Sequence, residues 1–336
     1  MRIGVDVMGG DNAPQAILEG ALAALDRIGP NDQLVLVGRE DVIRPAVESR
    51  QDDRIVIQHA PDEIGMGESP VEAVRNKQNS SITMLARMGS PKAEDRLDVI
   101  LSAGNTGAMA TAAQMYMRRL PHVTRPGIAV VIPTFAGPIV VIDVGANIEP
   151  KPQHLAEYGV MGHVYANKIL DIKEPRVALM NVGGEEQKGT AEMKQARDLL
   201  RDAAGVNFSG YIEGRGVFTG EADVVVTDGL VGNVMIKLAE GLSSGIFKII
   251  GREVQRIDPK LAEQFAPVVK KIYADHDYHE YGGAPLLGVN GVCVISHGSS
   301  ESRTITNAIV RAKQFHESGV NKTISEHLGK MERVPA

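Results

Sequence analysis

The chain has 336 residues, of which 43% are hydrophobic and 23% charged, a composition typical of a folded globular protein and not of a disordered or fibrous one. A formal net charge of -6 and an aromatic content of 4%, with no Trp, argue against nucleic acid as a partner. The single cysteine, Cys293, excludes an internal disulfide and fits a reducing cytoplasm.

Short apolar runs alternate with helical patterns along the chain, and this alternation predicts parallel strands joined by crossover helices. In chain order we predict strand 2–7, helix 13–28, strands 34–37 and 54–58, helix 70–88, strand 97–102, helix 107–119, strands 128–132 and 139–144, helix 154–169, strand 177–182, helix 190–203, strand 222–227, helix 231–250, strand 292–296 and helix 302–317. The strands 128–132 and 139–144 are separated by Pro and Gly, which predicts an antiparallel hairpin. No repeat or linker interrupts the pattern, so we expect a single α/β unit over 1–336.

A helical hairpin is predicted over 244–274. The pair Asp258-Pro259 is typical of a helix start. Apolar residues follow on one helical face, at 261, 265, 268, 269 and 272, and the preceding helix has its own at 247, 250, 254 and 257. This pattern favours packing on the core or on a second subunit, and contact with a membrane surface is the alternative. The uncharged apolar run 127–142 is too short for a membrane span, and we expect no signal peptide before the first strand.

Small polar and glycine-containing loops follow six of the predicted strands. They occupy 6–11, 102–108, 143–147, 181–184, 227–233 and 296–300. Carboxyl ends of parallel strands meet in one crevice, and the helices that follow present free N–H groups to an anion. We therefore predict an anion-binding crevice at one edge of the sheet, and the alternative is that each loop is only a tight turn.

The common cofactor and nucleophile motifs do not occur in the context that they need. No GxGxxG follows the first strand, and the string 184–190 lacks the Gly-Lys-Ser/Thr ending of a phosphate-binding loop. A GxSxG string at 241–245 lies inside the predicted helix 231–250 and not at the end of a strand. Cys293 lies in an apolar strand, which is typical of a core residue. His276 and His279 have no further metal-ligating partners in the pattern, so we interpret them as surface residues. We expect no cofactor and no metal.

Cationic side chains near these loops are candidates for holding a phosphate. Arg75 and Lys77 lie close to Ser80 and Ser81 in the predicted helix 70–88, Lys188 lies in a glycine loop, and Lys237 follows the loop 227–233. A solvated helix face is the alternative interpretation of the first group.

At these motifs the sequence closely resembles the bacterial phosphate acyltransferases of phospholipid synthesis. The matching strings are DVMGGD (6–11), ESPVEAVRNKQNSS (68–81), SAGNTGA (102–108), DVGAN (143–147), ADVVVTDGLVGN (222–233), YGGA (281–284) and HGSS (297–300). Each string is common by itself, but the set covers almost the whole chain and is specific.

The resemblance implies a three-layer α/β/α fold similar to those of the isocitrate and isopropylmalate dehydrogenases and the phosphotransacetylases. It implies transfer of a long acyl chain from acyl carrier protein to inorganic phosphate, which yields acyl phosphate for glycerol-3-phosphate acylation. It also implies a homodimer in the cytoplasm with peripheral membrane association, which passes its product to a membrane acyltransferase. Acyl carrier protein is acidic and needs a basic patch, for which Arg118-Arg119 and Lys270-Lys271 are candidates.

The resemblance and the loop pattern together suggest roles for individual residues. We assign phosphate binding to Gly104, Asn105, Thr106, Gly107, Arg75, Lys77 and Ser80 or Ser81. The thioester carbonyl and the phosphopantetheine arm would meet Asn147, Asn233 and Lys188, the last also a phosphate ligand. The residues Asp6, Gly9, Gly10, Asp11, Asp143 and Asp228 would orient the loops and cations, although Asp at a strand end often only caps a turn. His297 is a candidate proton donor to the leaving thiolate.

Three rival functions stay open at this point. Phosphotransacetylase-like transfer between acyl phosphate and coenzyme A shares the expected fold and intermediate. A decarboxylating dehydrogenase would need NAD(P) and Mg²⁺. A non-catalytic membrane scaffold would bind partners without turnover, but it has no need of polar loops at strand ends.

Overall fold

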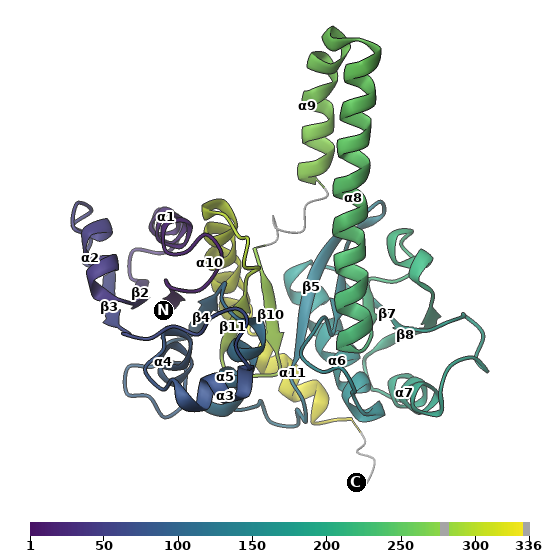
Figure 1. Cartoon of the computed structure of the whole chain (residues 1–336). Helices are drawn as coiled ribbons and strands as arrows, with labels where there is room; N and C mark the ends of the chain where they lie inside the picture. Colours follow the sequence, from purple (N-terminus) through teal and green to yellow (C-terminus); the bar gives the residue numbers. More distant parts are fainter. Residues whose placement is uncertain (276–281, 332–336) are drawn as a thin grey trace.

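A computed structural model describes residues 1–275 and 282–331 and places the strands in one sheet of eleven, in the order β3-β2-β1-β4-β11-β10-β5-β6-β9-β7-β8 (Figure 1). The predictions for His276, His279 and Tyr281 lie outside the described residues. The strands are β1 Arg2–Asp6, β2 Gln33–Gly38, β3 Ile55–His59, β4 Val99–Ser102, β5 Gly127–Thr134, β6 Gly137–Ile142, β7 Arg176–Met180, β8 Asn207–Ile212, β9 Val224–Val226, β10 Ala284–Leu287 and β11 Val292–Ile295.

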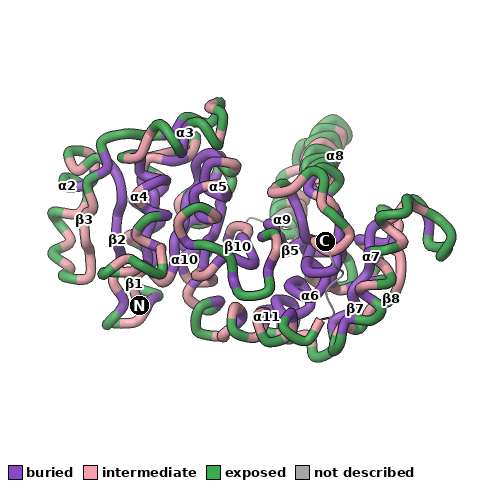
Figure 2. Tube along the Cα trace, turned by 90° about the horizontal axis from the view of Figure 1, so that it is seen from below, coloured by how far each residue is buried: buried purple, intermediate pink, exposed green. Residues whose placement is uncertain are grey.

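Helices cover both faces of this sheet. They are α1 Gln15–Ala24, α2 Glu40–Val47, α3 Pro70–Asn76, α4 Ser81–Met88, α5 Thr106–Tyr116, α6 Pro152–Ile169, α7 Ala191–Arg201, α8 Gly229–Ile257, α9 Pro259–Asp275, α10 Ser302–Glu317 and α11 Val320–Leu328, with a 3-10 turn at Gly214–Phe218. Alternate residues of β4 enter two different cores: Val99 and Leu101 pack in one, Ile100 in the other. The expected α/β/α layers and the antiparallel β5–β6 hairpin are therefore confirmed (Figure 2).

Several predicted boundaries were wrong for local reasons. The predicted helix 70–88 is two helices, because Lys77 leaves the helical region (φ -104, ψ 68) and Ser80 begins α4 by accepting a hydrogen bond from the Thr83 N–H. The prediction missed α2, β8, β10 and α11. Of these, α2 contains Pro45, and β10 has only four residues and contains Pro285. Short or proline-containing elements give weak periodic signals.

The direction of the strands changes across the sheet. The strands β3, β2, β1, β4 and β11 run parallel to one another, whereas the pairs β11–β10, β10–β5 and β5–β6 are antiparallel. Three reversals leave β6, β9, β7 and β8 running opposite to the first group. The expectation that all six polar loops share one edge is therefore wrong: they form two groups, which follow oppositely directed strands.

The long helix α8 connects these regions and then leaves the body of the protein. It has 29 residues, begins at the carboxyl end of β9, and its far half projects with α9 packed beside it (Figure 1). The sequence predicted only 231–250 for this helix. A Cβ at Gly232 would clash with the carbonyl oxygen of Asp143, so glycine allows α8 to pass close to the loop after β6.

Candidate active site

The loops after β1 and β4 are held together by a buried carboxylate. Asp6 is fully buried, and its two oxygens accept hydrogen bonds from the Ser102 hydroxyl at 2.6 Å and the Met8 N–H at 3.0 Å. Burial raises the pKa of Asp6 above its ordinary value. A Cβ at Gly9 would clash with the Asp6 carboxylate and the Gly104 amide, so the two loops touch through backbone atoms. The Asp11 N–H in turn donates to the Gly298 carbonyl at 2.7 Å, which adds the loop after β11.

Asn105 fixes the start of α5. Its side-chain oxygen accepts from the Ala108 N–H at 3.0 Å, and its amide nitrogen lies within 3.0 to 3.2 Å of three carbonyl oxygens, those of Gly65, Met66 and Glu68. The first N–H groups of a helix have no partner within it. Those of Thr106 and Gly107 are thus oriented for an anion, and the positive end of the helix dipole favours one there.

Lys77 lines a polar cavity of about 300 Å³ and is linked to Asn105 through Glu68, whose carboxylate contacts Lys77 and whose carbonyl contacts Asn105. Its ammonium donates to Glu68 at 2.7 Å and to the Glu63 carbonyl at 2.9 Å, so its charge is oriented by acidic neighbours. The charge of Lys77 lowers the pKa of the Glu68 carboxyl. Arg39 lines the same cavity, and sequence reasoning missed it because it lies outside every motif.

The other residues assigned to phosphate have different surroundings. Ser80 is buried, with its hydroxyl donating to the Lys77 carbonyl at 2.8 Å. Ser81 is buried and contributes a hydrogen bond to Asp6. Arg75 is exposed on α3. The roles of these three residues in phosphate binding stay predictions.

A central cavity of about 120 Å³ joins the two groups of loops across β5 and β10. Its lining is polar where Thr106, Asn233, Lys237 and His297 meet, and apolar along Ile128, Val130, Val144 and Ile236. The buried hydroxyl of Ser296, which also lines the cavity, has no hydrogen-bond partner among the described residues. A buried unpaired polar group of this kind is satisfied when a ligand or water enters.

Lys237 and His297 form a short contact at this cavity, with 2.7 Å between Nζ and Nε2. The other ring nitrogen of His297 lies 2.8 Å from the Ser299 hydroxyl and 3.2 Å from the Ser299 N–H. Either ring nitrogen can carry the proton. Lys237 Nζ also forms an ion pair with Glu240 at 3.1 Å, so a carboxylate lies at the same contact.

The loop after β6 is organised around a second buried carboxylate. Asp143 accepts hydrogen bonds from four N–H groups, those of Ile128, Gly145, Ala146 and Asn147, at 2.7 to 3.3 Å. Burial raises the pKa of Asp143. The Asn147 side chain donates to the Pro126 carbonyl at 2.8 Å and lies 2.7 Å from the Tyr158 hydroxyl, so it ties this loop to the start of β5.

Asp228 and Asn233 position the beginning of α8. Asp228 caps the helix by accepting from the Leu230 and Val231 N–H groups at 2.9 and 2.8 Å. One turn further, the Asn233 amide donates to the Val144 carbonyl at 3.3 Å and faces the central cavity.

Lys188 belongs to a separate loop. Its side chain lies beside Gly183, and its N–H donates to the Glu185 carbonyl at 3.0 Å. The neighbouring cavity, lined in part by Gly184, Tyr211 and Arg215, contains none of the other predicted site residues. The static structure thus brings Thr106, Asn233 and His297 together and leaves Lys188 apart from them.

Other features limit what the site contains. In 1–275 and 282–331, no three His, Cys, Asp or Glu side chains are grouped so as to hold a metal ion. Cys293 is buried and burial raises the pKa of its thiol, which disfavours a reactive thiolate. Over the same residues no helix has the length and apolar character needed to cross a bilayer.

Comparisons with known proteins agree with this geometry. The family described as fatty acid synthesis protein matches residues 1–323. A phosphate acyltransferase of Heliobacterium modesticaldum is 42% identical over 99% of this chain and 100% of its own length. One of Pelotomaculum thermopropionicum is 43% identical over 99% of this chain and 96% of its own.

Solved structures show the same fold at low identity. A phosphotransacetylase from Streptococcus pyogenes superimposes with a TM-score of 0.59, 17% identity and 94% coverage of both chains. A branched-chain phosphotransacylase from Enterococcus faecalis gives a TM-score of 0.55 at 13% identity, covering 94% of this chain and 99% of that one.

Proposed function

The chain belongs to the phosphate acyltransferase family of fatty acid and phospholipid synthesis, and from this premise we propose that it transfers a long acyl chain from acyl carrier protein to inorganic phosphate. The products are acyl phosphate and free carrier protein. The observation that carries the proposal is the central cavity, whose lining combines apolar side chains with Asn233, Lys237, Glu240 and His297.

In the proposed reaction a phosphate oxygen attacks the thioester carbon, and the C–S bond breaks. Phosphate is itself the nucleophile, so no Ser or Cys is needed. The amides of Thr106 and Gly107 and the charge of Lys77 hold phosphate at the start of α5. Fixing both reactants in contact is by itself a large part of the acceleration in such transfers.

The remaining groups act on the thioester. The Asn233 amide donates to the carbonyl oxygen as negative charge develops there. The proton for the leaving thiolate comes from the Lys237–His297 pair, whose nitrogens are 2.7 Å apart. The apolar wall of Ile128, Val130 and Ile236 receives the part of the acyl chain next to the carbonyl. Lys188 contacts the phosphopantetheine arm when carrier protein is bound.

We propose that the enzyme acts as one catalytic unit that dimerises through α8. Apolar side chains along this helix are strongly exposed, among them Val234 at 56%, Leu238 at 68%, Leu242 at 60% and Ile249 at 52%. They recur every three to four residues, which is the spacing of a helix–helix seam. The dimer would work in the cytoplasm and pass acyl phosphate to a membrane acyltransferase.

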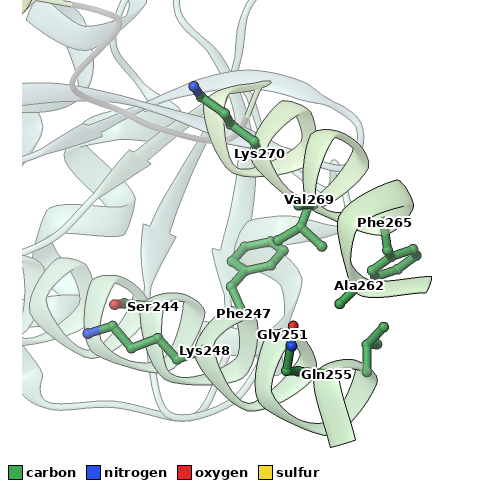
Figure 3. Close-up of a pocket in the computed structure, with 11 residues that line it drawn as sticks. Ser244, Phe247, Lys248, Gly251, Gln255, Ala262, Phe265, Val269 and Lys270 are labelled. Atoms are coloured by element: carbon green, nitrogen blue, oxygen red, sulfur yellow. The ribbon is translucent and has the colours of Figure 1, made fainter. Parts of the chain in front are cut away.

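The helices α8 and α9 also offer a surface for peripheral membrane contact. A cavity of about 550 Å³ separates them, and Phe247, Phe265 and Val269 surround it together with Lys248 and Lys270 (Figure 3). Apolar and basic side chains in one place are typical of a surface that meets anionic lipid. The residues around this cavity differ from those of the proposed dimer seam, so the membrane contact and the dimer are separate proposals.

The test is release of thiol from palmitoyl-acyl carrier protein by the purified enzyme, with and without phosphate. We expect phosphate-dependent release, with the acyl phosphate trapped as a hydroxamate by hydroxylamine. Palmitoyl-coenzyme A is the control substrate, because it carries the same acyl chain on coenzyme A and not on carrier protein. Equal or faster turnover of the coenzyme A thioester would replace this proposal by a phosphotransacetylase-like activity.

A further inference from the structure

A second concentration of positive charge lies in the loop between α5 and β5. Arg118, Arg119, His122 and Arg125 are exposed and line a polar cavity of about 800 Å³. Among the described residues, no carboxylate comes within ion-pair distance of Arg118, Arg119 or Arg125. On a chain with net charge -6, such a group of uncompensated arginines creates a local field of the opposite sign.

The positive charge extends to the start of α6. Burial and then the charges of Arg125 and Lys151 lower the pKa of His154, so these three residues are within electrostatic reach of one another. The nearby carboxyl of Glu157 is 1% exposed and accepts from the N–H and hydroxyl of Thr124, both at 2.8 Å. It lies beneath the loop and does not cover the arginines.

The loop has a fixed shape before any partner binds. The Leu120 N–H donates to the Gly288 carbonyl at 2.9 Å, and the Asn290 N–H donates to the Arg118 carbonyl at 3.0 Å. Arg118 and His122 adopt positive φ angles of 69° and 70°, which turn the chain sharply at both positions. A surface fixed in this way loses little conformational entropy on binding.

The basic cavity and the central cavity are consecutive along the chain. Thr124 and Arg125 line the first, and Ile128 lines the second. Three residues of extended chain cover about 10 Å. Between them, the Pro126 carbonyl accepts from Asn147. The basic loop and the central cavity are therefore about 10 Å apart along the chain, with the buried residues 126–127 between them.

We propose that the loop 118–125 is the docking surface for an acidic protein, the carrier that delivers the acyl thioester. The inference rests on the proposed function. A small anion is the weaker candidate, because the loop follows the carboxyl end of α5, where the helix dipole is negative. Arginines distributed over a whole loop are better suited to attract and orient the large acidic surface of a protein.

The experiment measures binding of fluorescently labelled holo-acyl carrier protein by anisotropy, so it needs no turnover. The variants are Arg118→Glu/Arg125→Glu and the milder Arg118→Gln/Arg125→Gln. The control is Lys168→Glu/Lys173→Glu, which carries the same charge change at and just beyond the carboxyl end of α6, where Lys168 is about 26 Å along the helix from Lys151. Thermal melts establish that all three fold.

We expect the Glu pair to weaken carrier binding about tenfold or more and to raise KM for acyl carrier protein with kcat retained. The Gln pair has a smaller effect of the same sign, and the control stays within about twofold of wild type. Wild-type affinity in the Glu pair would overturn the docking surface. The docking surface would also be overturned if the Glu pair kept its affinity for the carrier but lost binding to phosphatidylglycerol vesicles. That result would assign the loop to membrane contact.

The same experiments distinguish failure of the proposed reaction from failure of the proposed docking surface. If wild-type enzyme binds the carrier through this loop but releases no thiol with phosphate, the docking surface stands and the reaction is wrong. If short acyl-pantetheine thioesters lose turnover in the Glu pair as severely as acyl carrier protein does, the loop acts on the reaction itself and docking is overturned.

Discussion

The loops after β1, β4 and β11 bury polar groups, whereas α8 and α9 expose apolar ones. In the loops, Asp6 and Asn105 are almost fully enclosed and bonded to neighbouring backbone and hydroxyl groups. Along α8, Leu238 and Leu242 have exposed fractions of 68% and 60%. The first region is arranged before a ligand arrives, which catalysis requires. The second exposes a row of apolar side chains along α8, which is the condition of a surface that meets another molecule.

Substitutions in the polar loops should have the largest effect of all, a loss of enzymatic activity that substitutions on the exposed face of α8 do not cause. Asn105→Ala removes the cap of α5 and three contacts to the loop 65–68. We expect kcat/KM for phosphate to fall by about 10²- to 10³-fold. Asn307→Ala, which removes a surface bond to Arg27, is the control. If Asn105→Ala and Lys77→Ala both retain wild-type rates at low phosphate, the loops are not the phosphate site.

Lys237 belongs to α8, but its side chain lines the central cavity beside His297. A variant at this position therefore tests whether the first part of α8 acts with the loops in catalysis. Lys237→Gln keeps a hydrogen-bond donor near His297 and removes the charge and the mobile proton. We expect kcat to fall about 10²-fold with a changed dependence of kcat on pH. An unchanged pH profile measured by initial rates would place proton transfer elsewhere.

The buried Asp6 predicts a pH dependence that the projecting helices lack. Because burial raises its pKa in the folded protein, Asp6 costs no desolvation energy when it is protonated at low pH. It costs stability as the pH rises from about 4 through the raised value. The unfolding free energy of Asp6→Asn should therefore improve relative to wild type as the pH rises through this window. Urea unfolding at several pH values measures it, and a difference that moves in the opposite direction contradicts it.

The smallest effect on stability is expected at the apolar face of α8. Leu242→Lys changes an exposed side chain, so the unfolding free energy of the protomer should move by less than about 0.5 kcal/mol. Sedimentation should nevertheless show a dimer become a monomer. Ser243→Lys, on the neighbouring exposed position, is the matched control. A dimer that survives Leu242→Lys rules out this seam.

The sequence predicted the alternation of strands and helices because apolar residues form short continuous runs in buried strands and recur once per turn in amphipathic helices. It predicted the β5–β6 hairpin from the Pro and Gly between two apolar runs. It could not predict β10, whose four residues show no period. The two antiparallel pairings of β10 cancel, so the opposite direction of β6, β9, β7 and β8 comes from the predicted β5–β6 hairpin. The error about one shared edge arose because the consequence of that hairpin for the later strands was not followed.

For the site, local motifs singled out Asn105, Asn233 and His297 as candidates, because strand-end loops carry their own composition, and the fold places Asn233 and His297 at the central cavity. They did not identify Arg39, or the contact between Lys237 and His297, which are 60 residues apart. Contacts of that kind depend on where α8 runs relative to β11, and no local pattern contains this information. Lys188, by the same local reasoning, was grouped with residues from which the fold separates it.

A crystal structure of the enzyme with inorganic phosphate tests the central claim most directly. The account predicts phosphate at the start of α5, held by the Thr106 and Gly107 amides with the Lys77 ammonium beside it. Phosphate bound instead at the Lys188 loop, with the start of α5 empty at saturating concentration, would contradict it.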